Sequence, residues 1–175
     1  NNAGQYASGS GNIWMGYGAG KGATTSSPYS TGYYNIAIGY EAMNLHTTQA
    51  TYNVALGFAA LKNMTTADDN IAIGRSASVS TTTGYSNVGI GPASFYYNVT
   101  GYGAVAIGQN AGYSFGRGNH SPVGSIFIGS TAGYYATGSH NVFIGYESGK
   151  GSISGTPYGS GEHNIGMGYR ALYSF

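Results

Sequence analysis

The chain has 175 residues, enough for one domain, and its composition excludes several classes of protein. Only 6% of the residues are charged and the formal net charge is +1, so we expect neither a nucleic-acid partner nor a charge-expanded disordered chain. The absence of cysteine excludes disulfides and thiolate metal sites. The chain has no run of about 18 apolar residues, so we expect no membrane insertion.

Residues 1–11 form a Gly/Ser-rich lead-in, and one motif then recurs along residues 12–175. The motif is N-[IV]-x-[ILM]-G-x-x-[AS], with small departures in some copies. The nine copies span residues 12–19, 35–42, 53–60, 70–77, 87–94, 104–111, 125–132, 141–148 and 164–171. A repeat of this regularity indicates like units stacked on like units, as in fibrous and adhesive proteins rather than enzymes.

Each copy carries a strand signal. The first residue after the Asn position is β-branched and the third is aliphatic, as in Ile36 and Ile38, with a residue such as Ala37 between them. This alternation predicts a strand whose two aliphatic columns face the coil interior, while the middle column faces outward. Stacked in register at about 4.8 Å per coil, the strands predict an all-β parallel β-solenoid of nine coils. Each coil has about 16–23 residues.

Two further columns are expected to be structural. A glycine follows every strand, which indicates a backbone with positive φ or a contact too close for a Cβ atom: Gly16, Gly39, Gly57, Gly74, Gly91, Gly108, Gly129, Gly145 and Gly168. An asparagine precedes seven of the nine strands, with Ala104 and Ser125 as the exceptions. These side chains can form a hydrogen-bonded ladder along the stack or bond to local turns: Asn12, Asn35, Asn53, Asn70, Asn87, Asn141 and Asn164.

The copies at 53–60, 70–77 and 104–111 resemble the YadA-type head repeats of trimeric autotransporter adhesins. Those at 35–42 and 164–171 are similar to NxAIGxxA repeats of bacteriophage tail fibres and bacterial surface fibres. The resemblance covers about residues 12–175. It implies a left-handed β-roll, a homotrimeric fibre, and an extracellular location at a cell surface or on a virion tail fibre.

Self-association is also expected from the thin core of a single coil, which lateral packing would complete. The chain stops within a repeat at Phe175 without a polar cap, so an end-to-end filament is a second expectation.

Aromatic residues are the candidate binding groups. The position after the motif glycine is aromatic near both ends of the chain, and these rings should stack either as packing or as a surface for a sugar or protein: Tyr17, Tyr40, Phe58, Tyr146 and Tyr169. The connecting segments add candidates for a host-surface glycan or protein: Tyr33, Tyr34, Tyr96, Tyr97, Tyr134 and Tyr135.

The charged residues predict one ion pair and no catalytic site. Glu147 and Arg170 occupy the same column of adjacent coils and should pair. Glu41 shares that column but lies six coils from Glu147, too far for the paired carboxylates of a glycosidase. His140 and His163 also share a column and could stack or share a metal.

We therefore expect no catalytic residue, metal or cofactor. The first hypothesis is a non-enzymatic structural or adhesive fibre module that presents Tyr-rich loops. A self-assembling extracellular filament and a polysaccharide-degrading, tailspike-like enzyme are the alternatives.

Overall fold

The computed structural model describes residues 2–22, 30–46, 49–118, 120–152 and 159–174. Its nine strands are β1 (Ile13–Met15), β2 (Ile36–Ile38), β3 (Val54–Leu56), β4 (Ile71–Ile73), β5 (Val88–Ile90), β6 (Val105–Ile107), β7 (Ile126–Ile128), β8 (Val142–Ile144) and β9 (Ile165–Met167).

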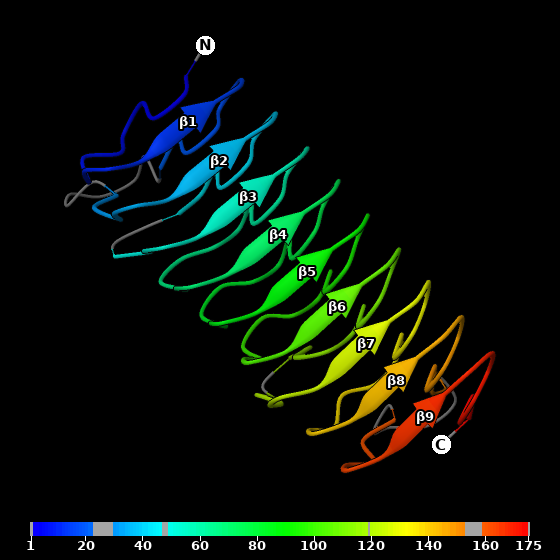
Figure 1. The fold of residues 1–175 in the computed structure, drawn as a ribbon. Coiled ribbons are helices and arrows are strands. Elements are labelled where there is room, and N and C mark those ends of the chain that lie inside the picture. The colour runs from blue at the N-terminus through cyan, green and yellow to red at the C-terminus, as the bar shows by residue number, and fades with distance from the viewer. Residues whose placement is uncertain (1, 23–29, 47–48, 119, 153–158, 175) are drawn as a thin grey trace.

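The strands form one parallel sheet in the order β1 to β9, each paired in register with the next repeat. Figure 1 shows them side by side along a rod, with the two termini at opposite ends. The expected all-β parallel β-solenoid is therefore confirmed. None of the described residues forms a helix long and apolar enough to cross a membrane.

The prediction of which side chains face the interior is wrong. Ala37, Ala55 and Ala72, in the middle column, are fully buried, whereas the aliphatic residues on either side of them are half-buried or exposed. The reason is that the segment after each strand shares the interior with the strand, so where that segment supplies a large side chain, as Met43 does beside Ala37, the strand supplies only a methyl group. The β-branched and aliphatic columns therefore lie on the outer face of the sheet.

The interior is filled by side chains of complementary size. The middle strand residue and the residue six positions later are both buried in most repeats. In seven of the nine copies a large side chain at one position accompanies a small one at the other, and the exceptions are Ala72 with Ser78 and Ala106 with Gly112. Phe127 is matched by Gly133, and a Cβ atom on Gly133 would overlap the Phe127 ring. Ala37 is instead matched by the buried Met43. In those seven copies the internal volume is filled from one wall of the coil or the other.

The asparagines form the ladder expected from the sequence. The backbone N–H of Asn53 donates to Asn35 Oδ1 (2.9 Å), and Asn53 Nδ2 donates to the same oxygen (3.1 Å) and to the Ala67 carbonyl (2.8 Å). The same side-chain pattern runs from Asn12 to Asn87 and again from Asn141 to Asn164. Buried amides are thereby satisfied without water, and each one bonds the coil before it.

The ladder is interrupted between β5 and β8. The N–H of Ala104 still donates to Asn87 Oδ1 (3.1 Å), but alanine has no amide with which to continue. Ser125 resumes the bonding only in part, through its Oγ, which accepts from the N–H of Asn141 (3.0 Å). The asparagine ladder therefore supplies no side-chain hydrogen bond between Ala104 and Ser125.

Both reasons proposed for the motif glycine hold. Its φ lies between +113° and +134° in all nine copies. A Cβ atom built on Gly91 would lie 2.7 Å from the carbonyl group of Gly108 in the next coil. Gly168, in the last repeat, has the same backbone conformation but nothing within 4 Å of that position.

Candidate interaction surfaces

The outer face of the sheet is a continuous aliphatic surface, which we call the aliphatic face. It consists of the first and third residues of each strand, two from each of nine strands and eighteen in all. Ile71 and Ile107, near the middle of the rod, are each 37% exposed, and Ile165 in β9 is 71% exposed. Soluble monomers rarely expose contiguous apolar patches larger than a few hundred Å². The exposed parts of these eighteen aliphatic side chains together form an apolar surface of roughly 500–1,000 Å².

The aromatic residues after the motif glycine stack as expected. Tyr17, Tyr40 and Phe58 form one ladder, with ring centroids 5.2 and 5.3 Å apart and interplanar angles of 16° and 5°. Tyr146 and Tyr169 form a shorter one, at 5.7 Å and 10°. All five rings are about half exposed or more. Because the rings cover one another's faces, they present mainly edges and hydroxyl groups to solvent.

The tyrosines of the connecting segments gather in two places. Tyr33 contacts Tyr34, and Tyr34 stacks on Tyr52 of the next coil (5.4 Å, 7°). Tyr96, Tyr97, Tyr134 and Tyr135 are brought together by Tyr113, which sequence reasoning did not select. The available signal was a fixed offset, since Tyr96, Tyr113 and Tyr134 each lie five residues after a motif glycine.

Glu147 and Arg170 form the ion pair expected from their shared column, with 2.7 Å between Arg170 Nε and Glu147 Oε2. A second cation, Lys150, pairs with Oε1 of the same carboxylate, which was not anticipated. The hydrogen bond from Lys150 is the largest of the effects that hold the pKa of Glu147 below its usual range. The group is a structural clamp on the last two coils, with one carboxylate shared between two cations.

Two further acidic side chains, Glu41 and Asp68, also bond to residues of neighbouring coils. Glu41 pairs with Lys62 of the next coil, with 2.7 Å between Oε2 and Nζ. Asp68 Oδ1 accepts from both the N–H and the hydroxyl of Thr51, at 2.7 and 2.8 Å. These carboxylates bond neighbouring coils, so their contacts favour a structural role over general acid–base catalysis.

Two histidine environments differ sharply. His140 and His163 stack on the surface with centroids 5.0 Å apart and an interplanar angle of 18°. Within the described part of the chain, no group of three or more potential metal-ligating side chains occurs. His46 is fully buried, with its ring centroid 5.3 Å from that of Trp14. Its Nδ1 bonds the Met43 carbonyl (2.9 Å), while Nε2 has no hydrogen-bond partner among the residues that the structure describes. Burial lowers the pKa of His46.

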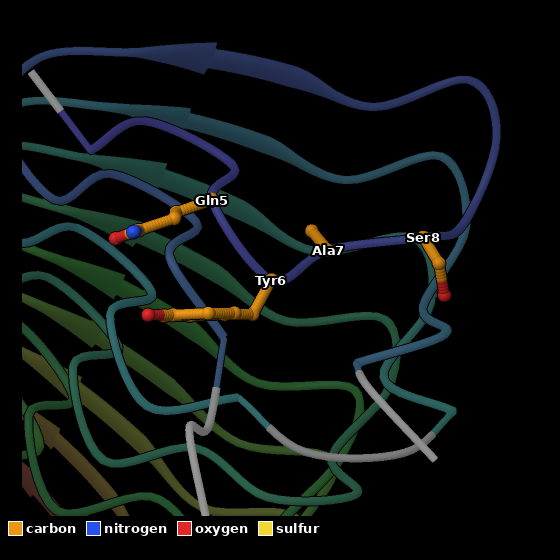
Figure 2. A pocket seen from close by; sticks show the side chains of 4 residues that line it. All are labelled: Gln5, Tyr6, Ala7 and Ser8. Atoms are coloured by element: carbon orange, nitrogen blue, oxygen red, sulfur yellow. The ribbon is translucent and has the colours of Figure 1, made fainter. Parts of the chain in front are cut away.

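Among the described residues, shallow hollows occur near both ends of the rod. One, of about 360 Å³, is lined by Gln5, Tyr6, Ala7 and Ser8, and Figure 2 shows the Gln5 and Tyr6 side chains extending in the same direction from this segment. The other, of about 270 Å³, is lined by six residues: Tyr135, Lys150, Gly151, Ser152, Tyr173 and Ser174. Lys150, the one charged residue that lines either hollow, is paired with Glu147. The extended surfaces are therefore the better candidates for function.

Comparisons with protein-family models, with curated proteins and with solved structures find no match to this chain, so they supply no relative from which a function could be transferred.

Proposed function

We propose that this protein is a non-enzymatic fibre module at a cell or virion surface, in which copies of the chain associate through their aliphatic faces. The observation that supports this proposal is the row of aliphatic side chains, partly or fully exposed, along all nine strands. Covering that face would remove an apolar area close to the roughly 800 Å² per partner of a stable interface. A homotrimer, with three faces meeting on one axis, is the arrangement that the repeat resemblance favours.

The same geometry suits an adhesive role. Association through the aliphatic face leaves the tyrosine-bearing segments on the remaining surfaces, where they can contact a host-surface glycan or protein. Tyrosine combines a large apolar ring with a polar hydroxyl at little conformational cost, which is why adaptable recognition surfaces use it. The scaffold then supplies length and rigidity, and the connecting segments supply attachment.

The oligomeric part is tested by placing charge on the aliphatic face. The wild-type chain should have a mass in solution three times the 17.9 kDa of one chain. Replacing both Ile71→Lys and Ile107→Lys should produce monomers with unchanged circular dichroism, because both side chains point outward from the coil. The matched control is Thr66→Lys with Ser121→Lys, two exposed positions away from the strands, which should leave the mass unchanged. A monomeric wild type would overturn the proposal.

The remaining alternatives have distinct outcomes. Electron microscopy of the native material should show fibres of limited length attached to a cell or virion, whereas filaments of unlimited length would favour the self-assembling subunit. Release of reducing ends from a polysaccharide by the purified chain would favour the tailspike-like enzyme.

A further inference from the structure

Five tyrosines form a contiguous group across β5 to β7, which we call the tyrosine cluster: Tyr96, Tyr97, Tyr113, Tyr134 and Tyr135. Tyr113 stacks between Tyr96 (5.1 Å, 16°) and Tyr134 (4.6 Å, 8°). Tyr97 and Tyr135 meet this stack edge-on, at 77° to Tyr96 and 74° to Tyr134. Arg117 lies over the Tyr97 ring at 4.8 Å. Both faces of the Tyr113 ring are thus covered by other tyrosines of the cluster.

The phenols of the cluster also influence one another. Burial, followed by the neighbouring phenols, raises the pKa of Tyr113 to about 12, and burial also raises the pKa of Tyr134. Both phenols are therefore protonated at neutral pH, so oxidation of either to a phenoxyl radical removes a proton together with the electron.

We propose that Tyr113 and Tyr134 are an oxidative modification site, at which a one-electron oxidant joins the two rings as dityrosine. Each phenol gives up one electron and one proton and becomes a phenoxyl radical. The two radicals form a carbon–carbon bond between ring positions ortho to the oxygens, and each ring hydrogen then moves to its own oxygen. The chain loses two hydrogen atoms in total, and the two electrons reduce the oxidant.

Proximity favours this pair. The two rings are held nearly parallel by their coils, so the coupling partner of either radical is already in contact with it. The other three phenols can pass a radical to the stack by direct contact. Tyr85 and Tyr102 provide a comparison within the same chain, because they stack at the same 4.6 Å and 11° without belonging to this cluster.

The location gives the bond a structural consequence. Tyr113 follows β6 and Tyr134 follows β7, so the link would join the coils of Ala104 and Ser125. Those are the coils between which the asparagine ladder is interrupted. A covalent bond there would join two coils that the asparagine ladder does not connect.

The experiment is photo-oxidation of the purified chain by tris(bipyridine)ruthenium(II) with persulfate, which accepts two electrons to form two sulfate ions. Trypsin cleaves after Arg75, Arg117 and Lys150, so Tyr113 and Tyr134 fall on different peptides, 76–117 and 118–150. We expect mass spectrometry to find these peptides joined, with a mass equal to their sum minus two hydrogens, and fragmentation to locate the bond at Tyr113 and Tyr134. Coupling of Tyr85 with Tyr102 would instead remain within peptide 76–117.

Variants and isotopes decide the result. Tyr134→Phe keeps a stacking ring without the phenol and should lower the joined product at least tenfold, while Tyr135→Phe should leave it. Mixing ¹⁵N-labelled with unlabelled chains should give no mixed product, since both residues lie in one chain. Persistence of the product in Tyr134→Phe, a mixed product, or its absence when other tyrosines of the chain are oxidised would each overturn the proposal.

Discussion

The size complementarity of the interior can be tested by exchanging a large side chain from one wall of the coil to the other. Phe127→Ala removes a fully buried ring and should destabilise the chain by about 3–5 kcal/mol. Gly133→Met alone places a side chain where the Phe127 ring already lies, which should cost about 1–3 kcal/mol for overpacking. Because Gly133 has a φ of +59°, a residue with a side chain there should lose roughly a further 1–2 kcal/mol of stability to its backbone conformation.

The double variant should be far more stable than the sum of these effects. Alanine at 127 with methionine at 133 reproduces the pairing of Ala37 with Met43, in which methionine adopts a φ of +48°. Because the double variant restores the internal volume, only two costs should remain. These are the conformational cost of a side chain at position 133 and the loss of the contacts of Phe127 with Phe115 and Phe143. We therefore expect a favourable coupling energy of at least about 2 kcal/mol in a double-mutant cycle.

The assay is urea denaturation of the four proteins, followed by circular dichroism. The matched control cycle combines Phe127→Ala with Gly118→Met, because Gly118 also has a positive φ (+75°) but has nothing within 4 Å of a Cβ atom. That cycle should be additive. A coupling energy within about 0.5 kcal/mol of zero for Phe127 and Gly133 would refute the reasoning.

Two further predictions concern the backbone and pH. Gly91→Ala should lose about 1–3 kcal/mol to its positive φ and a similar amount to the close approach of Gly108, whereas Gly168→Ala should lose only the first, as urea midpoints would show. Equal losses of stability in the two variants would mean that crowding between coils does not contribute at Gly91. His46 has a lowered pKa in the folded chain, so the unfolded chain takes up a proton first as pH falls below about 6.5. Stability should therefore be full above that pH and decline below it, by at most about 1.4 kcal/mol per pH unit. His46→Gln should flatten the dependence between pH 7 and 5, with Trp14 fluorescence as a local probe; an unchanged slope would contradict the assignment.

Much of the fold could be predicted from the motif. The three strand residues, the parallel register, the glycine conformation and the asparagine ladder all follow from columns that repeat at every coil, and each occurs in the structure. These features depend on local backbone geometry and on contacts between equivalent residues. A stacked repeat makes such contacts predictable, because residue n of one coil must meet residue n of the next.

The orientation of the strands could not be predicted from hydrophobicity alone. Ile36 and Ile38 are more apolar than Ala37, yet Ala37 is the buried residue, since the folded-back segment limits the space inside the coil. The relation between Phe127 and Gly133, or Ala37 and Met43, was present in the sequence as a size correlation six residues apart. Hydrophobic periodicity does not detect a correlation of that kind.

The candidate surfaces were predicted in part. The partnership of Glu147 and Arg170 followed from their column, whereas Lys150 and the pairing of Glu41 with Lys62 join different columns. Tyr113 was missed because the tyrosines were considered by their neighbours in sequence and not by their offset from the motif glycine. Three-dimensional adjacency between columns depends on how each connecting segment folds, which spacing alone does not specify.

The asparagine ladder also determines how such a rod can change its length. Each amide bonds only to the coil beside it, so insertion or deletion of one whole coil would restore every bond on either side of the change. A shift of a single residue would instead put a different side chain in the ladder and turn the outer face of the strand inward. Where the ladder is continuous, recombination of the coding sequence can therefore lengthen or shorten the rod in steps of one coil, about 4.8 Å each, without changing the pattern of the ladder.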